Sequence, residues 1–193
     1  MEPKTSTKKL AEVADIFTGV RLSRYEKENT KPQKALVHKS ITQDNPTIEP
    51  KIVQVNNQID PKYYTKENDI VYKLQGTPFG RRITTETGLI VSHSFAIIRT
   101  KPGYNPTYIE NFLNYPIVQN ELKIISNESL IAHMNMKTLN NLTITTPSTE
   151  EQNKYGEIVN LIDQRIKANT ALIANDQEMK ISLISKLIGD NHE

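Results

Sequence analysis

The chain has 193 residues, of which 36% are hydrophobic and 24% charged, a size and composition that suit one domain with an appendage. It contains no cysteine, which excludes a disulfide framework and a thiolate metal site. No apolar run reaches membrane-spanning length, and the first residues lack the apolar region of a signal peptide. We therefore expect a cytoplasmic protein.

The net charge of +2 hides a difference between two parts of the chain. Residues 1–140 carry 19 basic and 14 acidic side chains, whereas residues 141–193 carry 5 and 8. A mildly basic body followed by an acidic segment suits a body that meets a polyanion.

Short strand-like segments separated by turn residues dominate the first half of the chain. Residues 8–20 alternate short apolar groups, which predicts a helical turn or strand that ends in a loop at Gly19. Further strands are expected at residues 35–41, 51–55, 70–74, 81–83, 88–93 and 95–99, with turns at Asn45-Pro46, Asp60-Pro61 and residues 75–80.

The apolar period changes in residues 107–125. Tyr108, Phe112, Val118 and Leu122 are spaced as in helices, with a break near Pro116. A polar loop over residues 127–135 and a last strand through Leu139, Leu142 and Ile144 then lead to Pro147. Residues 1–147 are thus expected to form an α+β domain with a strand-rich core and short helices.

A long helical pattern covers residues 149–188, within a predicted helical region of residues 148–189. Ser148 or Thr149 can cap its first turn, and acidic side chains follow at the positive end of the helix dipole. A helix about 58 Å long cannot bury its apolar stripe against the preceding domain alone. The residues expected to contact a partner are Ile158, Val159, Ile162, Ile166, Asn169, Ile173, Leu183 and Leu187.

No second long helical pattern exists in the chain, so the simplest partner for this helix is a second copy or another protein. Asn169, Asp176 and Lys180 fall where a heptad pattern would continue with apolar residues, and polar core positions fix register and partner at a cost in stability. The alternatives are a helix docked on its own domain and an irregular two-helix hairpin with a solvated middle.

The sequence lacks the residue patterns of the common enzyme and metal sites. His38, His93, His133 and His192 are scattered without an HExxH pair, and the phosphate-binding motifs GxGxxG and GxxxxGK[ST] are absent. No serine lies in a GxSxG turn. We expect a chain that is not itself an enzyme and holds neither a cofactor nor a metal.

Residue types suited to nucleic acid are more frequent in the predicted loops. Arginine pairs with guanine edges and Asn or Gln with adenine edges, while lysine and serine suit phosphates. Turns at strand ends let a rigid sheet aim such side chains. The candidate DNA-binding residues are Arg21, Ser23, Arg24, Lys34, His38, Lys39, Gln75, Thr77, Arg81, Arg82, His93, Ser94, His133 and Asn135.

Several stretches follow one another in a recognisable order: KLAEVADIFTGVRLSR, ENDIVYKLQGTPFGRR, VSHSFAIIRTKPGYNPTYIENFLN and MNMKTLNNLTITTPSTEEQNKYGEIVNLIDQRI. Leu142, Ile144 and Pro147 lead into Glu151-Gln152 at the start of the long helix. In this order the stretches resemble one half of a type I restriction-modification DNA specificity subunit, in a half-length form with a single target-recognition domain. The likeness covers nearly the whole chain.

The resemblance implies a non-catalytic subunit that binds DNA sequence-specifically. Specificity subunits of the family usually hold two target-recognition domains and two long helical regions, and this chain holds one of each. A homodimer would restore the family arrangement and read an interrupted palindrome. The family's helices space the half-sites and dock modification subunits, which carry S-adenosylmethionine and methylate adenine; a restriction subunit joins some of these complexes.

Two other functions fit the same residues. The chain could be an interaction scaffold that dimerises through its helix without reading DNA. It could also be a remnant that binds an intact methyltransferase complex as a competitor. Retention by duplex DNA separates the specificity subunit from both alternatives, and co-purification with a methyltransferase separates the scaffold from the other two.

Overall fold

The computed structural model describes residues 6–42, 47–56, 58–127 and 134–189. The chain divides into two compact units, Met1–Asn153 (unit 1) and Lys154–Glu193 (unit 2), and each is described by itself. The domain boundary expected at residue 147 stays a prediction. In the part of the chain that is described, no helix is both long and apolar enough to cross a membrane.

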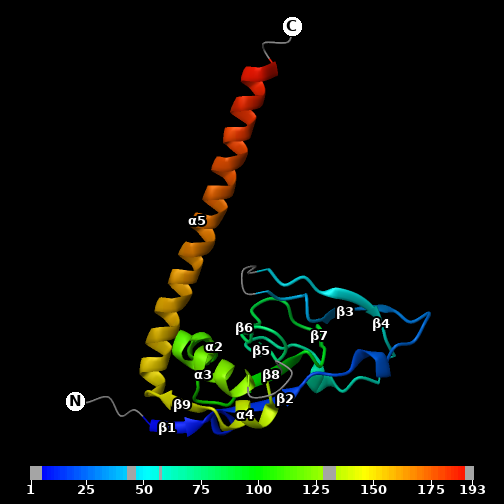
Figure 1. Cartoon of the computed structure of the whole chain (residues 1–193), viewed down its shortest axis with the longest axis vertical. Helices are drawn as coiled ribbons and strands as arrows, with labels where there is room; N and C mark the ends of the chain where they lie inside the picture. The colour runs from blue at the N-terminus through cyan, green and yellow to red at the C-terminus, as the bar shows by residue number, and fades with distance from the viewer. Residues whose placement is uncertain (1–5, 43–46, 57, 128–133, 190–193) are drawn as a thin grey trace. The chain divides into compact units, whose positions relative to one another are not determined.

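Unit 1 consists of short strands, most of them before residue 101, and short helices, most of them after it, and one long helix begins at its end (Figure 1). The strands are β1 (Ser6–Lys9), β2 (Ala14–Thr18), β3 (Pro32–Leu36), β4 (Lys51–Gln54), β5 (Ile70–Lys73), β6 (Gly80–Arg82), β7 (Ile90–Val91), β8 (Phe95–Thr100) and β9 (Thr143–Thr146). The helices are α1 (Leu10–Val13), α2 (Pro106–Asn114), α3 (Pro116–Asn127), α4 (Met136–Asn141) and α5 (Thr149–Gly189), with 3₁₀ turns η1 (Leu22–Arg24) and η2 (Pro61–Tyr63).

The strands form three small sheets. The largest has the order β2-β8-β5-β6 and is antiparallel throughout. The second has the order β4-β3-β7, with β3 and β7 parallel, and the third pairs β1 with β9. Strands and helices thus occupy separate parts of unit 1, which confirms the predicted α+β class.

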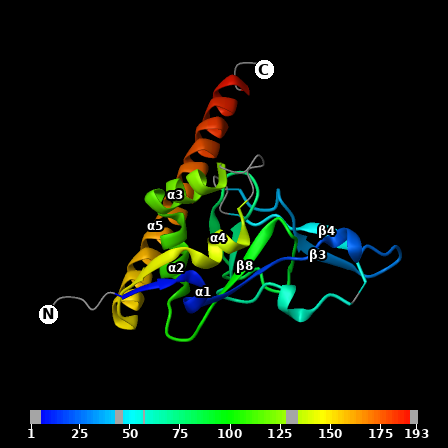
Figure 2. The same cartoon turned by 60° about the horizontal axis from the view of Figure 1, so that its bottom comes forward.

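Successive side chains along the central strands point to opposite faces of the sheet and enter two different hydrophobic clusters. In β8, Ala96 and Ile98 face one hydrophobic cluster, while Phe95 and Ile97 face another on the opposite side of the sheet. The first cluster is completed by α2, α3 and α4, which lie together on one side of the sheet in Figure 2. The second cluster packs the other side against Leu36 of β3 and its neighbours. A two-residue period therefore gives the largest sheet two buried faces.

Helix α2 covers the edge of the largest sheet along β6. The Asn114 side chain accepts a hydrogen bond from Gly80 N and donates one to Gly80 O, both at 2.8 Å. One turn earlier, Glu110 Oε1 accepts from Arg82 N at 2.8 Å. Residues four apart on a helix share a face, so two α2 side chains satisfy backbone groups that another strand would otherwise pair.

The first turn of α5 is fastened within unit 1. Ser148 N donates to Glu151 Oε2 at 3.0 Å and Glu151 N to Ser148 Oγ at 3.3 Å, a reciprocal capping box that confirms Ser148 as the cap. Gln152 is buried, accepts from Asn105 N at 3.0 Å and donates to Pro147 O at 2.9 Å. Glu151 thus caps the start of α5, and Gln152 bonds its first turn to Asn105 and Pro147.

Some predicted elements differ from the structure. The break between α2 and α3 at Tyr115 and the long helix are confirmed. The strand expected at residues 35–41 occupies 32–36 instead, because it pairs with both β4 and β7 there. The expectation that Leu139 begins the last strand is wrong: Leu139 is buried in α4, and the strand β9 begins at Thr143.

Candidate nucleic-acid interface

The turn at residues 92–95 connects three distant segments of unit 1. Phe95 N donates to Ser92 O at 3.1 Å and closes the turn. His93 N donates to Val20 O at 2.8 Å, and Ser92 N to Leu36 O at 3.0 Å. Leu74 N donates to Ser94 O at 2.9 Å. Because backbone groups make these bonds, the segments that follow residues 20, 36 and 74 are held around one turn.

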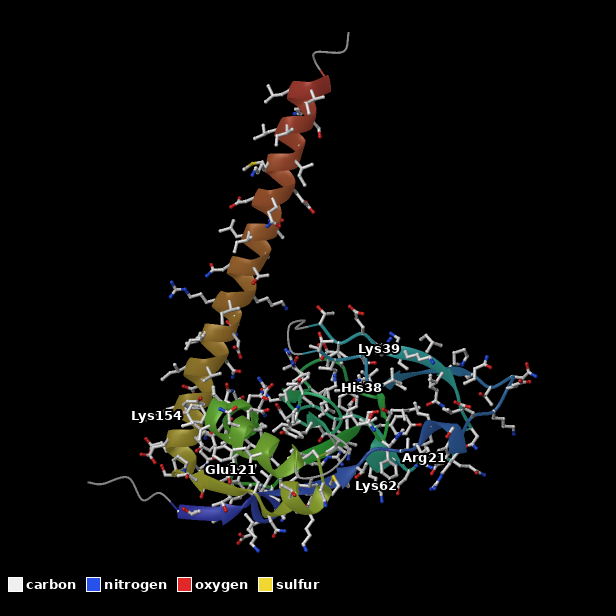
Figure 3. The ribbon with its side chains drawn as sticks, in the orientation of Figure 1. Arg21, His38, Lys39, Lys62, Glu121 and Lys154 are labelled. Carbon is white, nitrogen blue, oxygen red and sulfur yellow. The ribbon has the colours of Figure 1, made fainter. Side chains whose placement is uncertain are left out.

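Gly19 allows the first of these segments to approach. A Cβ atom on Gly19 would lie 2.4 Å from the backbone oxygens of both Val91 and Ser92, closer than real Cβ atoms come. Only glycine fits such an approach of two backbones. Arg21, two residues later, is exposed and precedes η1, which carries Ser23 and Arg24 (Figure 3).

A cluster of cationic side chains lies next to the turn, beyond the end of β3. His38 and Lys39 are exposed there, and the His38 ring carbon Cε1 lies 3.8 Å from where a Cβ of Gly76 would be (Figure 3). Lys73 ends β5, and its Nζ donates to Ile41 O at 3.4 Å and lies 5.8 Å from the Phe79 ring centre. The strand end thus brings a third cation to this surface.

The charges in this cluster act on one another. Desolvation lowers the pKa of His38 below its usual value of 6.5, and the positive charges of Lys73 and Lys39 lower it further. Burial also lowers the pKa of Lys73. Lys39 and Lys73 oppose a positive charge on His38, and an anion bound at the same place would offset this repulsion.

The remaining candidates near this turn differ in exposure. His93 and Thr77 are exposed and Gln75 is half-buried, whereas Ser94 is buried, which leaves its hydroxyl little access to a ligand. Met134 N donates to Leu74 O at 2.7 Å and so brings exposed Asn135 to the same region, where its side chain caps α4 by accepting from Lys137 N at 2.8 Å. His133 lies outside the described residues.

Arg81 and Arg82 lie on β6, away from the turn, and on opposite faces of the sheet. Arg82 is paired with Ile70, on the face that α2 covers, and its Nε lies 3.6 Å from Glu110 Oε2. Its guanidinium also donates to Asn68 Oδ1 at 3.2 Å. Arg81 is paired with Val71, on the other face. Arg82 is therefore engaged within the fold, and Lys34, in the middle of β3, is likewise separate from the turn.

A buried ion pair supports the frame behind this surface. Arg99 Nε and Nη2 donate to Asp69 Oδ1 and Oδ2 at 2.8 and 2.7 Å, and Asp69 is 1% exposed. Asp69 Oδ2 also accepts from Lys66 N at 2.8 Å, and Asp69 O from Ile83 N at 2.8 Å. One carboxylate thus ties the end of β8 to the turn before β5.

Sequence reasoning missed Lys73 as a candidate. The available signal was a lysine that ends an apolar strand directly before the Gln75-Gly76 turn. Metal chemistry finds no support in the described part of the chain, where no three His, Asp or Glu side chains gather as a metal site would require.

Unit 2 carries the second predicted interface. Within the helix α5, the predicted residues Ile158, Ile162, Ile166, Ile173, Leu183 and Leu187 are between 50% and 69% exposed. Val159 is half-buried and Asn169 exposed. No side chains from elsewhere in unit 2 are available to cover this stripe, since every described residue of the unit belongs to the one helix.

Comparison with known proteins identifies a family. The model of the type I restriction modification DNA specificity domain matches residues 3–175. The fold is similar to the HsdS subunit from Thermoanaerobacter tengcongensis, at a TM-score of 0.63 and 19% identity over 87% of this chain and 39% of that one. It is also similar to the type I restriction-modification S subunit from M. genitalium, at 0.62 and 14% over 92% and 44%.

A third similar structure concerns complex assembly and conformational transition of the type I R-M system, with a TM-score of 0.63 and 18% identity over 87% of this chain and 40% of that one. This chain therefore spans less than half the length of the solved chains it matches. No curated protein matches significantly.

Proposed function

This chain belongs to the family of type I restriction modification DNA specificity domains, and on that premise we propose that it is the DNA-reading subunit of a type I restriction-modification system. It acts as a homodimer on an interrupted palindrome and docks modification subunits. The observation that carries the proposal is the family match over residues 3–175.

The surface around the turn at residues 92–95 is the proposed DNA contact. Arg21, His38, Lys39 and Lys73 come from different segments, and backbone hydrogen bonds hold these segments in place. Several fixed cations suit the phosphates of one duplex, while Gln75 and Asn135 offer amides for base edges. The other predicted DNA-binding residues, Ser23 and Arg24 among them, extend this surface.

Dimerisation through α5 is proposed for the apolar stripe. A 41-residue helix is about 60 Å long. The isoleucines and leucines of its stripe are exposed to water, which is unfavourable, and a second helix packed along the stripe would bury them. Two identical domains related by a twofold axis read inverted half-sites. The target is therefore an interrupted palindrome.

Modification subunits dock on a second set of apolar residues on α5. Leu161, Leu172 and Met179 are 58–65% exposed and lie to one side of the main stripe. S-adenosylmethionine and the methyl transfer to adenine belong to the modification subunit, and cleavage to a restriction subunit where the system has one. This chain is non-catalytic, holds no cofactor or metal of its own, and works in the cytoplasm.

A scaffold that does not read DNA is the second candidate. It is favoured by an exposed apolar group on unit 1, formed by Tyr115, Ile117 and Ile124 at the start of α3 and along it. Such a group fits a protein partner. Specific retention of the chain by duplex DNA would count against this candidate.

Mapping of methylated adenines tests the proposal. The gene and its neighbours are expressed in a host that lacks other adenine methylation, and the modified sites are read from genomic DNA. We expect one motif with inverted half-sites around a spacer of fixed length, and its loss when the gene is deleted. An asymmetric motif would contradict the homodimer, and unchanged methylation after deletion would contradict the reading role.

A further inference from the structure

Strands β3 and β4 form a two-stranded ribbon whose two faces have different surroundings. The strands are antiparallel, with Lys34 opposite Ile52 and Gln33 opposite Val53. The ribbon lies on the side of unit 1 that is away from α2 and α3 (Figures 1 and 2). Its connection to the rest of the sheet is the parallel pairing of β3 with β7, so β4 is the outer strand.

One face of the ribbon is held against the body of unit 1. Ala35 and Val55 are fully buried in one hydrophobic cluster, and Val53 packs against the same cluster. Gln33 lies on this face as well, and its Oε1 accepts a hydrogen bond from Tyr64 Oη at 3.1 Å. This face is therefore occupied by contacts within the fold.

Backbone contacts along its outer edge also hold β4 in place. Lys27 N donates to Gln54 O at 3.2 Å, and Glu26 forms an antiparallel bridge with Val55. The residues before β3 thus pair with the end of β4. Side chains on the ribbon are consequently presented from a backbone that is supported on one face and at one edge.

The other face of the ribbon is exposed and carries three side chains of different chemistry. Successive residues of a strand point to opposite faces, so Lys34, Ile52 and Gln54 share the face opposite Val53. All three are exposed, and the Ile52 side chain is 56% exposed although it lies within a strand. Farther along β3, Leu36 on this face is buried, so the exposed part ends there.

Each of these side chains matches a feature of base pairs in the major groove of DNA. Lysine donates to the O6 and N7 acceptors of guanine, glutamine pairs with N6 and N7 of adenine, and an apolar side chain contacts the thymine methyl group. The major groove is about 12 Å wide and admits a two-stranded β-ribbon. The exposed face of the ribbon therefore fits this groove in shape and in chemistry.

Positive charge surrounds the ribbon. Residues 21–40 carry two acidic side chains and six basic ones, which are Arg21, Arg24, Lys27, Lys31, Lys34 and Lys39. His38 and Lys39 of the proposed DNA contact follow directly after β3 (Figure 3). Cations beside a groove-reading element bind phosphates and fix its register. A protein partner matches this surface less well, because lysine is depleted at the centres of protein interfaces.

We propose that the β3–β4 ribbon enters the major groove, where Gln54 reads an adenine, Ile52 contacts a thymine methyl group and Lys34 reads a guanine. The inference rests on the proposed DNA-reading function and adds the element and the residues that read bases. Ile52 and Gln54 are about 6.8 Å apart along β4, so their bases lie within about two base pairs of each other. Of these three residues, the sequence pointed only to Lys34.

Selection from random duplexes tests the reading by Gln54 and Lys34. The full chain is expressed with the products of its neighbouring genes and incubated with a pool of random-sequence duplexes, and the bound duplexes are sequenced. We expect the wild-type protein to enrich one motif. Gln54→Ala and Lys34→Ala should each lose about tenfold discrimination at one base pair of each half-site and keep the rest of the motif.

Removal of one methyl group from the DNA tests Ile52 directly. In the selected motif each thymine is replaced in turn by uracil, which lacks only the C5 methyl group. The wild-type protein should lose about fourfold affinity at one thymine, and Ile52→Ala should bind both duplexes equally. Ile117→Ala is the matched control: Ile117 is 66% exposed on α3, and its truncation should leave the uracil penalty unchanged.

Salt dependence separates base contacts from phosphate contacts. Lys31→Gln should lower the slope of log affinity against log salt by about one, whereas Gln54→Ala should leave the slope unchanged. If Gln54→Ala weakened all duplexes uniformly, its role in base reading would be refuted. Far-UV circular dichroism of each variant checks that the fold is retained, as expected for changes at exposed positions.

The outcomes distinguish this inference from the proposed function. If the wild-type protein enriches a motif while the ribbon variants keep every base preference and the uracil penalty, the ribbon does not read bases and the proposed function stands. If the wild-type protein enriches no motif, both are refuted. If the variants change only sedimentation or retention of a protein partner, the ribbon contacts protein and the inference is overturned.

Discussion

Unit 1 and unit 2 solve the burial of apolar residues in opposite ways. Ile98 of β8 is fully buried among helices of its own unit, whereas Ile166 of α5 is 58% exposed. The first unit completes its core from segments far apart in the chain, while the second has only one helix to offer. Unit 1 thus buries its apolar residues within itself, whereas unit 2 leaves its apolar stripe exposed. We therefore expect association through unit 2.

The largest effect is expected from the buried ion pair of unit 1. Arg99→Ala leaves the Asp69 carboxylate buried without its counter-charge, which typically costs about 3–5 kcal/mol of unfolding free energy. Urea unfolding followed by tyrosine fluorescence measures the loss. The exposed pair Lys62–Asp60, at 3.7 Å, is the control, and Lys62→Ala should change the stability by less than about 1 kcal/mol. Equal losses of unfolding free energy for Arg99→Ala and Lys62→Ala would show that the Arg99–Asp69 pair does not support the fold of unit 1.

Matched isoleucine truncations sharpen the comparison. Ile98→Ala should lower the unfolding free energy of unit 1 by about 2–5 kcal/mol at every protein concentration. Ile166→Ala should leave the unfolding of unit 1 unchanged and raise the dimer dissociation constant about tenfold, through two symmetry-related truncations. Denaturation at two concentrations, with sedimentation, separates the effects. If Ile166→Ala destabilised unit 1 in the monomer, Ile166 would belong to the core of unit 1 and the contrast between the two units would be wrong.

Salt titration of DNA binding assigns the contact to one unit. Lys39→Gln should reduce the slope of log affinity against log salt by about one, as expected for one lost phosphate contact. Lys167→Gln on α5 is the control and should leave the slope unchanged when the protein is kept dimeric. If Lys167→Gln lowered the slope and Lys39→Gln left it unchanged, the DNA contact would have to be assigned to unit 2.

The smallest effect concerns the pH dependence of binding through His38. Burial and the neighbouring lysines lower the pKa of His38, which favours the neutral ring in the free protein. A nearby phosphate favours the protonated ring, so DNA affinity should rise about two- to threefold as the pH falls from 7.5 to 6. His38→Gln should flatten this part of the profile, measured by fluorescence anisotropy.

Without DNA, the same lowered pKa acts in the opposite direction. Below pH 6.5 the unfolded chain binds the proton more readily than the folded one, so unit 1 should lose some stability as the pH falls. A wild-type protein that gains stability below pH 6.5, relative to His38→Gln, would contradict the cationic surroundings of His38.

The sequence allowed the prediction of elements with a strong local pattern. The alternation in β8 and the three-four spacing in α5 are visible in short windows, and Pro116 marks the start of α3. Helix α4 lacked such a pattern, because Leu139 is its one buried residue. Its signal was the cap, where Asn135 accepts from Lys137 N.

The candidate site was predictable in its residue types but not in its assembly. Loop cations such as Arg21 and His38 could be named from the sequence. The turn at residues 92–95, to which the segments before them are bonded, depends on backbone hydrogen bonds to residues 20, 36 and 74, which no local pattern reveals. The engagement of Arg82 by Glu110 likewise joins residues distant in sequence. The predicted DNA contacts stay predictions.

The cover that Glu110 and Asn114 place over β6 has a consequence for the proposed homodimer. Joining two copies raises the local concentration of their sheet edges. An edge strand with unpaired backbone groups then promotes strand pairing between molecules and aggregation into fibrils. Occupying the hydrogen-bonding groups of Gly80 and Arg82 from a helix closes that route at β6. The surface proposed for pairing is instead the exposed apolar stripe of α5, which one partner helix can cover.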